Sequence, residues 1–259
     1  MIGISFIERI ESLHSKNLLH RDIKPENFVI GSGSQSNVVF MIDFGLARLY
    51  KNAEGRHISM KEGNGLIGTA RYCSVNAHLG RELSRRDDLE SIGYTLIYFL
   101  KSRLPWQNVK GKNRAEKYKK IKKIKMNIKT KELCSDIPEC FKVYMDYVKN
   151  LNFAEAPSYS NLKKIFLGEL ANQAFELDYC FDWCLMKDEA SDEKEEMDEK
   201  SPGLVKRGSG LGGRGGGGGK ENVGFGAKKK VVTFSGIERP DAKMKRGVSS
   251  GNVLFSSNG

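Results

Sequence analysis

The chain has 259 residues, a formal net charge of +11 and 28 glycines, of which 16 lie in residues 201–259. This uneven distribution predicts a globular part followed by a Gly-rich tail, and it excludes a single uniform domain. The longest apolar run is the nine residues Ile92–Leu100, whereas a membrane-spanning helix needs about 20, so we expect no membrane-embedded segment. The five cysteines form no C-x-x-C pair, which favours reduced thiols and a cytoplasmic or nuclear protein.

Charge and composition divide the chain into three parts. We expect a domain over residues 1–187 with a net charge of +9, an acidic linker over 188–200 with a net charge of −6, and a basic, Gly-rich tail over 201–259 with a net charge of +8. A polar, Gly-rich tract cannot bury enough apolar surface to fold, so we expect the tail to be disordered.

Within the first part, residues 110–131 are strongly basic, with eleven Lys and Arg against the single acid Glu116. Three isoleucines recur there at helical spacing, which predicts an amphipathic helix with its basic side in water (Ile121, Ile124 and Ile128). Such a surface attracts acidic or phosphorylated proteins or nucleic acid. A solvated helix face explains the same lysines equally well, and both interpretations stay open.

In chain order, the hydrophobic pattern begins with a helix over residues 1–15, where apolar side chains recur every three or four positions. Polar residues around Pro25 indicate a loop. Two β-branched or apolar segments follow at 28–30 and 38–42, with a Gly- and Ser-rich turn between them. These segments predict a small β-hairpin.

The remainder of the domain is expected to be helical. Residues 44–80 show little periodicity and predict a long surface loop, whereas Leu89–Leu100 is apolar on all sides and predicts a buried central helix. Later helices are expected at residues 112–126, 137–152, 159–171 and 171–176. The expected fold class is therefore mainly α with a small β-hairpin.

Two short motifs flank the predicted hairpin. The first is His20-Arg21-Asp22-Ile23-Lys24-Pro25-Glu26-Asn27, and the second, sixteen residues after Asn27, is Asp43-Phe44-Gly45. In this order they resemble the catalytic loop H-R-D-x-x-x-x-N and the D-F-G motif of protein kinases. A pair of ordinary turn carboxylates is the alternative explanation for Asp22 and Asp43, but the joint match is far more specific than either motif alone.

The residue types suit phosphoryl transfer, which needs mainly position and charge from the protein. Asp22 can accept the proton of an attacking hydroxyl, and Lys24 can neutralise charge that builds on the transferred phosphate. Asn27 and Asp43 offer the oxygen ligands that Mg²⁺ prefers, so ATP and Mg²⁺ are the expected cofactors. Gly45 permits the backbone turn after Asp43.

More specifically, residues 1–187 resemble the casein kinase I family of Ser/Thr protein kinases. The resemblance is carried by the two motifs together with six further segments: Leu13–Asn17, Gly68–Tyr72, His78–Gly80, Ser84–Ser91, Leu104–Gln107 and Phe181–Trp183. Ser74-Val75-Asn76 stands where most protein kinases carry A-P-E, and the family's own version of that site is similar. The resemblance implies the helix-rich C-terminal lobe of a kinase.

The resemblance also implies roles for single residues. Thr69 matches an activation-segment Thr that contacts the catalytic Asp and Lys. Arg71 and Lys117 match an anion-binding site for acidic or already phosphorylated protein substrates, although Asn64 replaces a further lysine of that site. Asp88 matches a buried Asp that binds the backbone of the catalytic loop, and a helix N-cap is its alternative explanation. His20, Phe44 and Gly45 are expected to be structural.

One part of the kinase pattern is missing from the sequence. Only 21 residues precede Asp22, and they contain no Gly-rich phosphate loop and no Lys–Glu pair of the kind that a complete kinase uses. We therefore expect weak binding of ATP and Mg²⁺, and an exposed apolar surface where a second lobe would pack.

Three hypotheses follow. In the first hypothesis, the chain is a truncated piece of an active Ser/Thr kinase whose N-terminal lobe lies upstream, and the piece alone has little activity. In the second, it is a catalytically dead scaffold that binds acidic or phosphorylated proteins. In the third hypothesis, the basic tail over residues 201–259 binds RNA or acidic partners electrostatically.

Overall fold

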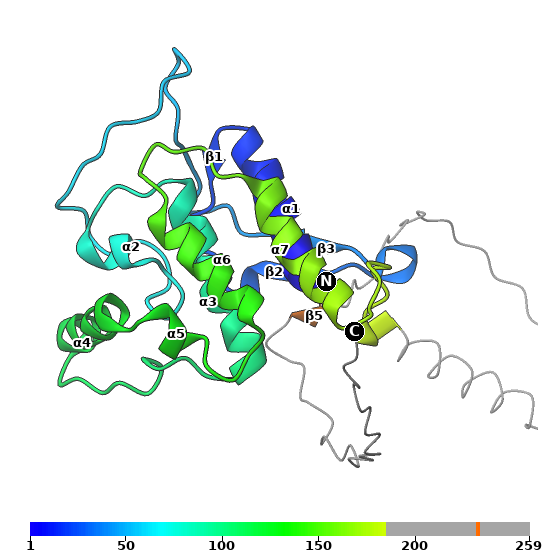
Figure 1. Cartoon of the computed structure of the whole chain (residues 1–259). Coiled ribbons are helices and arrows are strands. Elements are labelled where there is room, and N and C mark those ends of the chain that lie inside the picture. The colour runs from blue at the N-terminus through cyan, green and yellow to red at the C-terminus, as the bar shows by residue number, and fades with distance from the viewer. Residues whose placement is uncertain (185–231, 234–259) are drawn as a thin grey trace, which may run out of the picture.

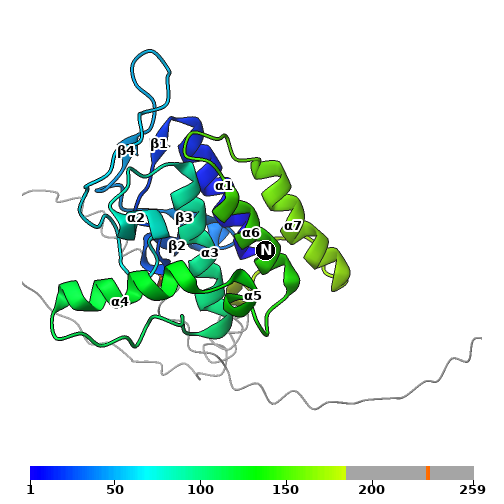
Figure 2. The same cartoon turned by 60° about the vertical axis from the view of Figure 1, so that its left-hand side comes forward.

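A computed structural model of the chain describes residues 1–184 and the two-residue strand Val232–Thr233. Four helices form the centre of the molecule (Figures 1 and 2): α1 (Ile2–Ser15), α3 (Arg85–Lys101), α6 (Glu139–Asn150) and α7 (Tyr159–Asn172). Helix α1 contacts both α3 and α7, while α6 contacts α3 and α7. The predicted helices at 1–15, 89–100, 137–152 and 159–171 are thus confirmed, with ends shifted by a few residues.

Helix α3 is the buried element that the sequence predicts. Leu89, Ile92, Tyr94 and Ile97 are fully buried along it. The helix begins four residues before Leu89, because the carboxylate of Asp87 accepts a hydrogen bond of 2.8 Å from the backbone N–H of the N-cap residue Ser84. An N-cap position for Asp88 is therefore wrong, since Asp88 lies inside the first turns of the helix.

The strands are short and antiparallel. Strand β2 (Phe28–Ile30) pairs with β3 (Val39–Met41) in the register Phe28 with Met41, which confirms the predicted hairpin. Strand β1 (Leu18–Leu19) pairs with β4 (Arg48–Leu49). Two single-turn 3₁₀ helices, η1 (Pro25–Asn27) and η2 (Gly33–Gln35), stand before β2 and within the hairpin turn.

The predicted long loop over residues 44–80 contains two regular elements, β4 and the helix α2 (Val75–Leu79). Helix α2 starts where the Ser74 hydroxyl accepts the N–H of Ala77 at 3.1 Å, and it ends at Gly80, whose φ is +71°. Such short elements carry too few residues to produce a readable hydrophobic period. The expectation of one continuous loop is wrong for this reason.

Helix α4 (Arg114–Asn127) lies to one side of the central helices, next to α2 (Figure 2). It begins at the N-cap residue Asn113, whose side chain accepts the N–H of Glu116 at 2.9 Å. The four-residue helix α5 (Thr130–Leu133) follows without having been predicted. A separate helix at residues 171–176 is wrong, because α7 ends at Asn172.

The expected tail and linker fall almost entirely outside the described residues. The exception is strand β5 (Val232–Thr233), which pairs antiparallel with β2. This pairing corrects the expectation that no residue of the segment 201–259 has regular structure. None of the helices described by the structure combines the length and the apolar character needed to cross a membrane.

A buried carboxylate joins four parts of this fold. Asp88 on α3 is 2% exposed and accepts the backbone N–H groups of His20 and Arg21, both at 2.8 Å. It also contacts His14 Nε2 at 2.9 Å, and His14 Nδ1 lies 2.6 Å from the hydroxyl of Tyr159. Burial alone would raise the pKa of Asp88, but hydrogen bonds from His14 and the neighbouring imidazoles hold it below its ordinary value.

The packing of α3 against α6 leaves no room for a side chain at Gly93. A Cβ at this position would lie 2.2 Å from the sulfur of Met145 and 3.1 Å from a ring carbon of Tyr144. Gly168 on α7 has no such neighbour within 4 Å. Gly93 and Gly168 therefore allow the same substitution to be compared at a tightly packed and at an open helical position.

We expect Gly93→Ala to lower the free energy of unfolding by about 1–3 kcal/mol, because the new methyl group forces Met145 to move in a packed core. Gly168→Ala should instead raise the free energy of unfolding by about 0.5–1 kcal/mol, since alanine is the better helix former. Urea unfolding of both variants measures this, and a stabilising Gly93→Ala would contradict the tight contact.

We expect Asp88→Asn to lower the free energy of unfolding by about 3–5 kcal/mol, because the amide cannot accept all three hydrogen bonds and leaves donors unpaired. Asp136→Asn is the control. Asp136 is exposed and has a φ of +60° that asparagine tolerates well, so its stability should change by less than about 0.5 kcal/mol. Thermal unfolding that gives equal values for the two variants would rule out the role of Asp88.

Candidate active site

The loop between β1 and β2 carries a nearly buried carboxylate. Asp22 is 9% exposed, and its Oδ1 accepts both the backbone N–H and the hydroxyl of Thr69, at 2.9 and 2.8 Å. Its Oδ2 accepts a hydrogen bond of 2.7 Å from Lys24 Nζ. The structure thus brings together Asp22, Lys24 and Thr69, although 45 positions separate Lys24 from Thr69 in the sequence. The carboxylate is oriented from both sides, and its oxygens keep lone pairs for a further donor.

A glycine allows the two loops to meet. Gly68 has a φ of +81°, and a Cβ there would lie 2.5 Å from the carbonyl oxygen of Arg21. Any other residue would be strained at this φ and would collide with the catalytic loop. The sequence contained this residue only as part of a segment typical of the family, with no separate signal for its role.

His20 fixes the start of the catalytic loop. It is fully buried, its Nε2 donates to the carbonyl of Ile42 at 3.1 Å, and its Nδ1 accepts the N–H of Asp22 at 3.3 Å. The Phe44 ring lies 5.5 Å from the imidazole ring and is 49% exposed. Because both ring nitrogens bind backbone groups, His20 is placed to hold the loop rather than to exchange a proton with a substrate.

Asn27 and Asp43 stand at the same end of the β2–β3 hairpin, since Ile42 donates its N–H to the carbonyl of Asn27 at 2.9 Å. Asn27 is 3% exposed and uses its Nδ2 to bind the carbonyl of Asp22 at 2.8 Å, so its amide oxygen is left for a cation. Asp43 is exposed and has a φ of +63°, and its Oδ1 accepts the N–H of Gly45 at 3.2 Å.

These two oxygen donors fit Mg²⁺, which keeps several waters and commonly takes only one or two protein ligands beside phosphate oxygens. Among the residues that the structure describes, no group of three or more His, Cys, Asp or Glu side chains is placed to hold a metal ion by itself. The donor set therefore suits a cation that arrives with a nucleotide, and it does not suit a permanent structural metal.

Arg71 and Lys117 line one pocket of about 320 Å³, which also includes Thr69 and Glu26. Lys117 is exposed on α4, and the Arg71 guanidinium lies over the rings of Tyr72 and Tyr98, 5.7 and 5.9 Å from their centroids. The pocket is thus linked to Asp22 through Thr69. A guanidinium and an ammonium group facing one cavity suit a phosphate or a carboxylate.

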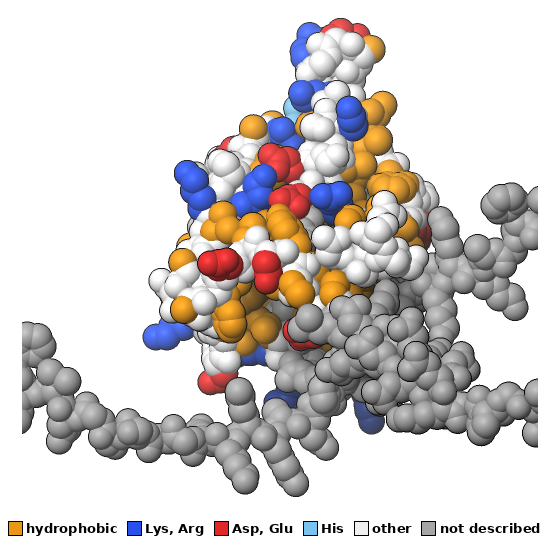
Figure 3. Space-filling model, turned by 90° about the vertical axis from the view of Figure 1, so that its right-hand side faces the viewer, with side chains coloured by type: hydrophobic (Ala, Val, Ile, Leu, Met, Phe, Trp, Pro, Cys, Tyr) orange, Lys and Arg blue, Asp and Glu red, His pale blue; other side chains and the backbone are white. Residues whose placement is uncertain are grey.

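Large hydrophobic side chains are exposed beside Asp43. Four of them lie within residues 42–49 and are 38–55% exposed: Ile42, Phe44, Leu46 and Leu49. Hydrophobic side chains also gather in several groups on the face seen in Figure 3. Exposed apolar side chains that cluster next to a functional loop are typical of a surface that another body covers.

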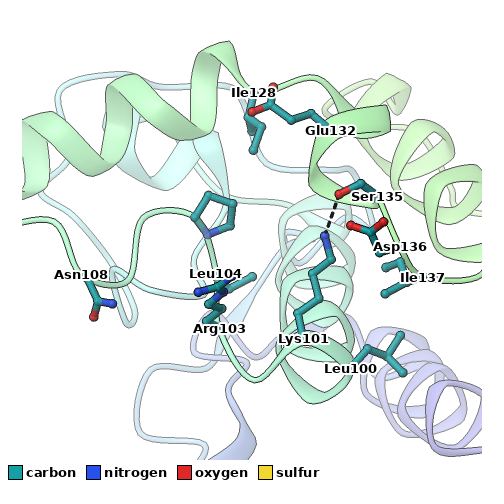
Figure 4. A pocket seen from close by; sticks show the side chains of 11 residues that line it. Leu100, Lys101, Arg103, Leu104, Asn108, Ile128, Glu132, Ser135, Asp136 and Ile137 are labelled. Carbon is teal, nitrogen blue, oxygen red and sulfur yellow. Dashed lines mark hydrogen bonds between the residues drawn. The ribbon is translucent and has the colours of Figure 1, made fainter.

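A larger pocket, of about 660 Å³, lies near the end of α3 and beside α5 (Figure 4). Lys101 crosses it and donates to the Ser135 hydroxyl at 3.2 Å and to the Leu133 carbonyl at 3.1 Å. None of the residues predicted for catalysis or anion binding lines this pocket. The chemistry that the sequence predicts therefore belongs to the smaller pocket and the neighbouring loops.

A family model described as protein kinase domain matches residues 3–173. The match spans the loop of Asp22, the hairpin with Asn27 and Asp43, and both walls of the pocket formed by Arg71 and Lys117. The matched region covers well over half of the chain. The chain belongs to the protein kinase family.

Proposed function

We propose that the chain is a Ser/Thr protein kinase of casein kinase I type, which transfers the γ-phosphoryl group of ATP to Ser or Thr in acidic or already phosphorylated proteins. The observation that carries this proposal is the Asp22 carboxylate, held between Lys24 and Thr69 and adjoining a pocket with two cationic side chains. Protein kinases in general use ATP with Mg²⁺.

Each residue has a definite task in the proposed reaction. Asp22 accepts the proton of the substrate hydroxyl and orients it, while Lys24 lies close enough to offset charge on the phosphate. Thr69 keeps the carboxylate in place. Asn27 and Asp43 are the residues that would hold Mg²⁺ with ATP, and the cation supplies neutralisation of the phosphate charge.

The proposed reaction also needs a cover over the nucleotide. The 21 residues before Asp22 form α1 and β1 and contain no Gly-rich loop. The exposed side chains of residues 42–49 support packing of a second lobe against this edge. We therefore propose that transfer requires a nucleotide-binding lobe packed against the exposed edge at residues 42–49, and that residues 1–184 by themselves bind ATP weakly.

A catalytically dead scaffold is the second candidate. It is favoured by the pocket that Arg71 and Lys117 line, because two cationic side chains at one cavity can hold an anion without any turnover. In this case the chain would bind acidic or phosphorylated proteins without turning them over. The two candidates differ in whether an added nucleotide-binding lobe restores transfer.

We expect the chain alone to transfer no phosphate to casein, and a chimera with the N-terminal lobe of a casein kinase I protein joined before residue 1 to do so. In the chimera, Asp22→Asn should lower kcat by about 10²–10⁴, because the proton acceptor is lost. Asp43→Asn should abolish turnover, because the carboxylate that would hold Mg²⁺ is lost.

Radiolabelled ATP measures the transfer, and Asp178→Asn, at an exposed carboxylate near the end of the described domain, is the control. A folded but inactive chimera would favour the scaffold. Robust transfer by the chain alone that depends on Asp22 would contradict the need for a second lobe.

We expect Arg71→Ala in the chimera to reduce the preference for phosphorylated over unphosphorylated peptides by about tenfold or more, since a hydrogen bond to a charged group contributes roughly 1.5–3 kcal/mol. Peptide pairs that differ only in one upstream phosphoserine measure this through kcat/KM. Arg103→Ala, at an exposed arginine of the larger pocket, is the control. Equal loss on both peptides would refute anion recognition by Arg71.

A further inference from the structure

Helix α4 carries a buried lysine among its exposed ones. Lys125 is 1% exposed, and its Nζ donates to the backbone carbonyls of Cys73 at 2.5 Å and Ala70 at 3.1 Å. The ammonium group also lies 4.8 and 4.9 Å from the ring centroids of Tyr94 and Trp106. Its hydrogen bonds go to backbone carbonyls rather than to a carboxylate, which is unusual for a buried lysine.

The two carbonyls belong to the segment that forms one wall of the anion pocket. This segment, residues 69–73, begins at Thr69, which binds Asp22, and includes Arg71. Trp106 Nε1 donates to the carbonyl of Arg71 at 2.7 Å, and His78 Nε2 lies 3.2 Å from the carbonyl of Ala70. The segment is therefore held by its backbone from several sides, and Lys125 binds two of its carbonyls.

The same helix forms the opposite wall. Lys117 stands two turns before Lys125 on α4 and lines the pocket together with Arg71. A rigid helix keeps residues eight positions apart about 12 Å from each other along its axis. The hydrogen bonds from Lys125 to residues 70 and 73 therefore link the position of Arg71 to the position of Lys117.

A buried ammonium group is costly to the folded state. Burial lowers the pKa of Lys125 to about 8, with Cys73 and Glu90 partly offsetting this and Lys149 adding to it. An apolar side chain of similar length would avoid the cost of burying the charge. Such a side chain could not donate hydrogen bonds to the carbonyls of Ala70 and Cys73. The buried ammonium group is therefore best explained by its role in fixing the position of residues 70 and 73.

We propose that Lys125 is a positioning residue for the anion pocket: it ties residues 70 and 73 to α4 and thereby sets the separation of Arg71 and Lys117. This inference rests on the proposed preference for phosphorylated substrates. Lys125 is buried behind the wall of the pocket and does not line the pocket itself.

The test uses the full-length chain and three variants at this position. Lys125→Met removes the donor and keeps the length of the side chain, Lys125→Arg keeps a cationic donor, and Lys125→Gln keeps a shorter neutral one. Lys123→Met is the matched control, because it removes the same charge from an exposed position of the same helix. The measurements are amide hydrogen exchange over residues 69–73, affinity for a phosphoserine peptide and its unphosphorylated counterpart, and thermal unfolding.

We expect Lys125→Met to speed exchange at residues 69–73 and to weaken phosphopeptide binding by about tenfold, or about 1.4 kcal/mol. Lys125→Arg should recover part of the exchange protection and part of the phosphopeptide affinity. Lys123→Met should match the wild type in amide exchange. A merely stabilising role would change thermal unfolding and leave the preference for the phosphorylated peptide as it is.

Unchanged amide exchange at residues 69–73 in Lys125→Met overturns the inference. This holds even if the variant binds the phosphopeptide more weakly, since the lost positive charge alone would then explain the lower affinity. If the wild type binds no phosphopeptide, the proposed substrate preference is refuted. If Lys125→Met nevertheless exchanges faster at residues 69–73, the positioning role of Lys125 is still supported. If Lys125→Met does not fold, Lys125→Gln decides: its exchange must lie above that of the wild type.

Discussion

The buried carboxylate of Asp88 is the contact on which the candidate site depends. It receives two adjacent backbone N–H groups from the catalytic loop, at His20 and Arg21, and it is anchored in the central helix α3. Arg21 has a φ of +67°, a conformation that is unfavourable without such support. Because these hydrogen bonds go to the backbone, they set the path of the loop regardless of its side chains. They therefore also set the direction in which the side chain of the next residue, Asp22, points.

The same principle recurs at the other wall of the site. Residues 69–73 are held through their carbonyls by Lys125 and Trp106, and through Thr69 by Asp22 itself. Two loops far apart in the sequence thus share one carboxylate, and each is tied by its backbone to a different helix. Such preorganisation is what phosphoryl transfer needs most from a protein, since the reaction relies on position and on charge.

Much of this could be predicted from local sequence. The hairpin follows from two apolar segments around a turn, the central helix from a run that is apolar on all sides, and helix α1 from its hydrophobic period. The two motifs place Asp22, Asn27 and Asp43 around that hairpin. Helices α2 and α5 are too short to show a period, and their ends depend on a cap such as Ser74. Asp88 is ambiguous in the sequence, because an acid near a helix start suits both a cap and a buried anchor.

The sequence by itself determined the kinase family, through the order and spacing of residues that must carry charge. Tertiary structure alone decided that Gly68 passes against Arg21, and that Lys125 is buried while Lys123 on the same helix is exposed. The contact of Thr69 with Asp22 followed only from the family resemblance, and the structure shows its geometry. The physical reason is range: periodicity and motifs report on residues a few positions apart, whereas burial of a charge or the meeting of two loops depends on partners 45 or more positions away.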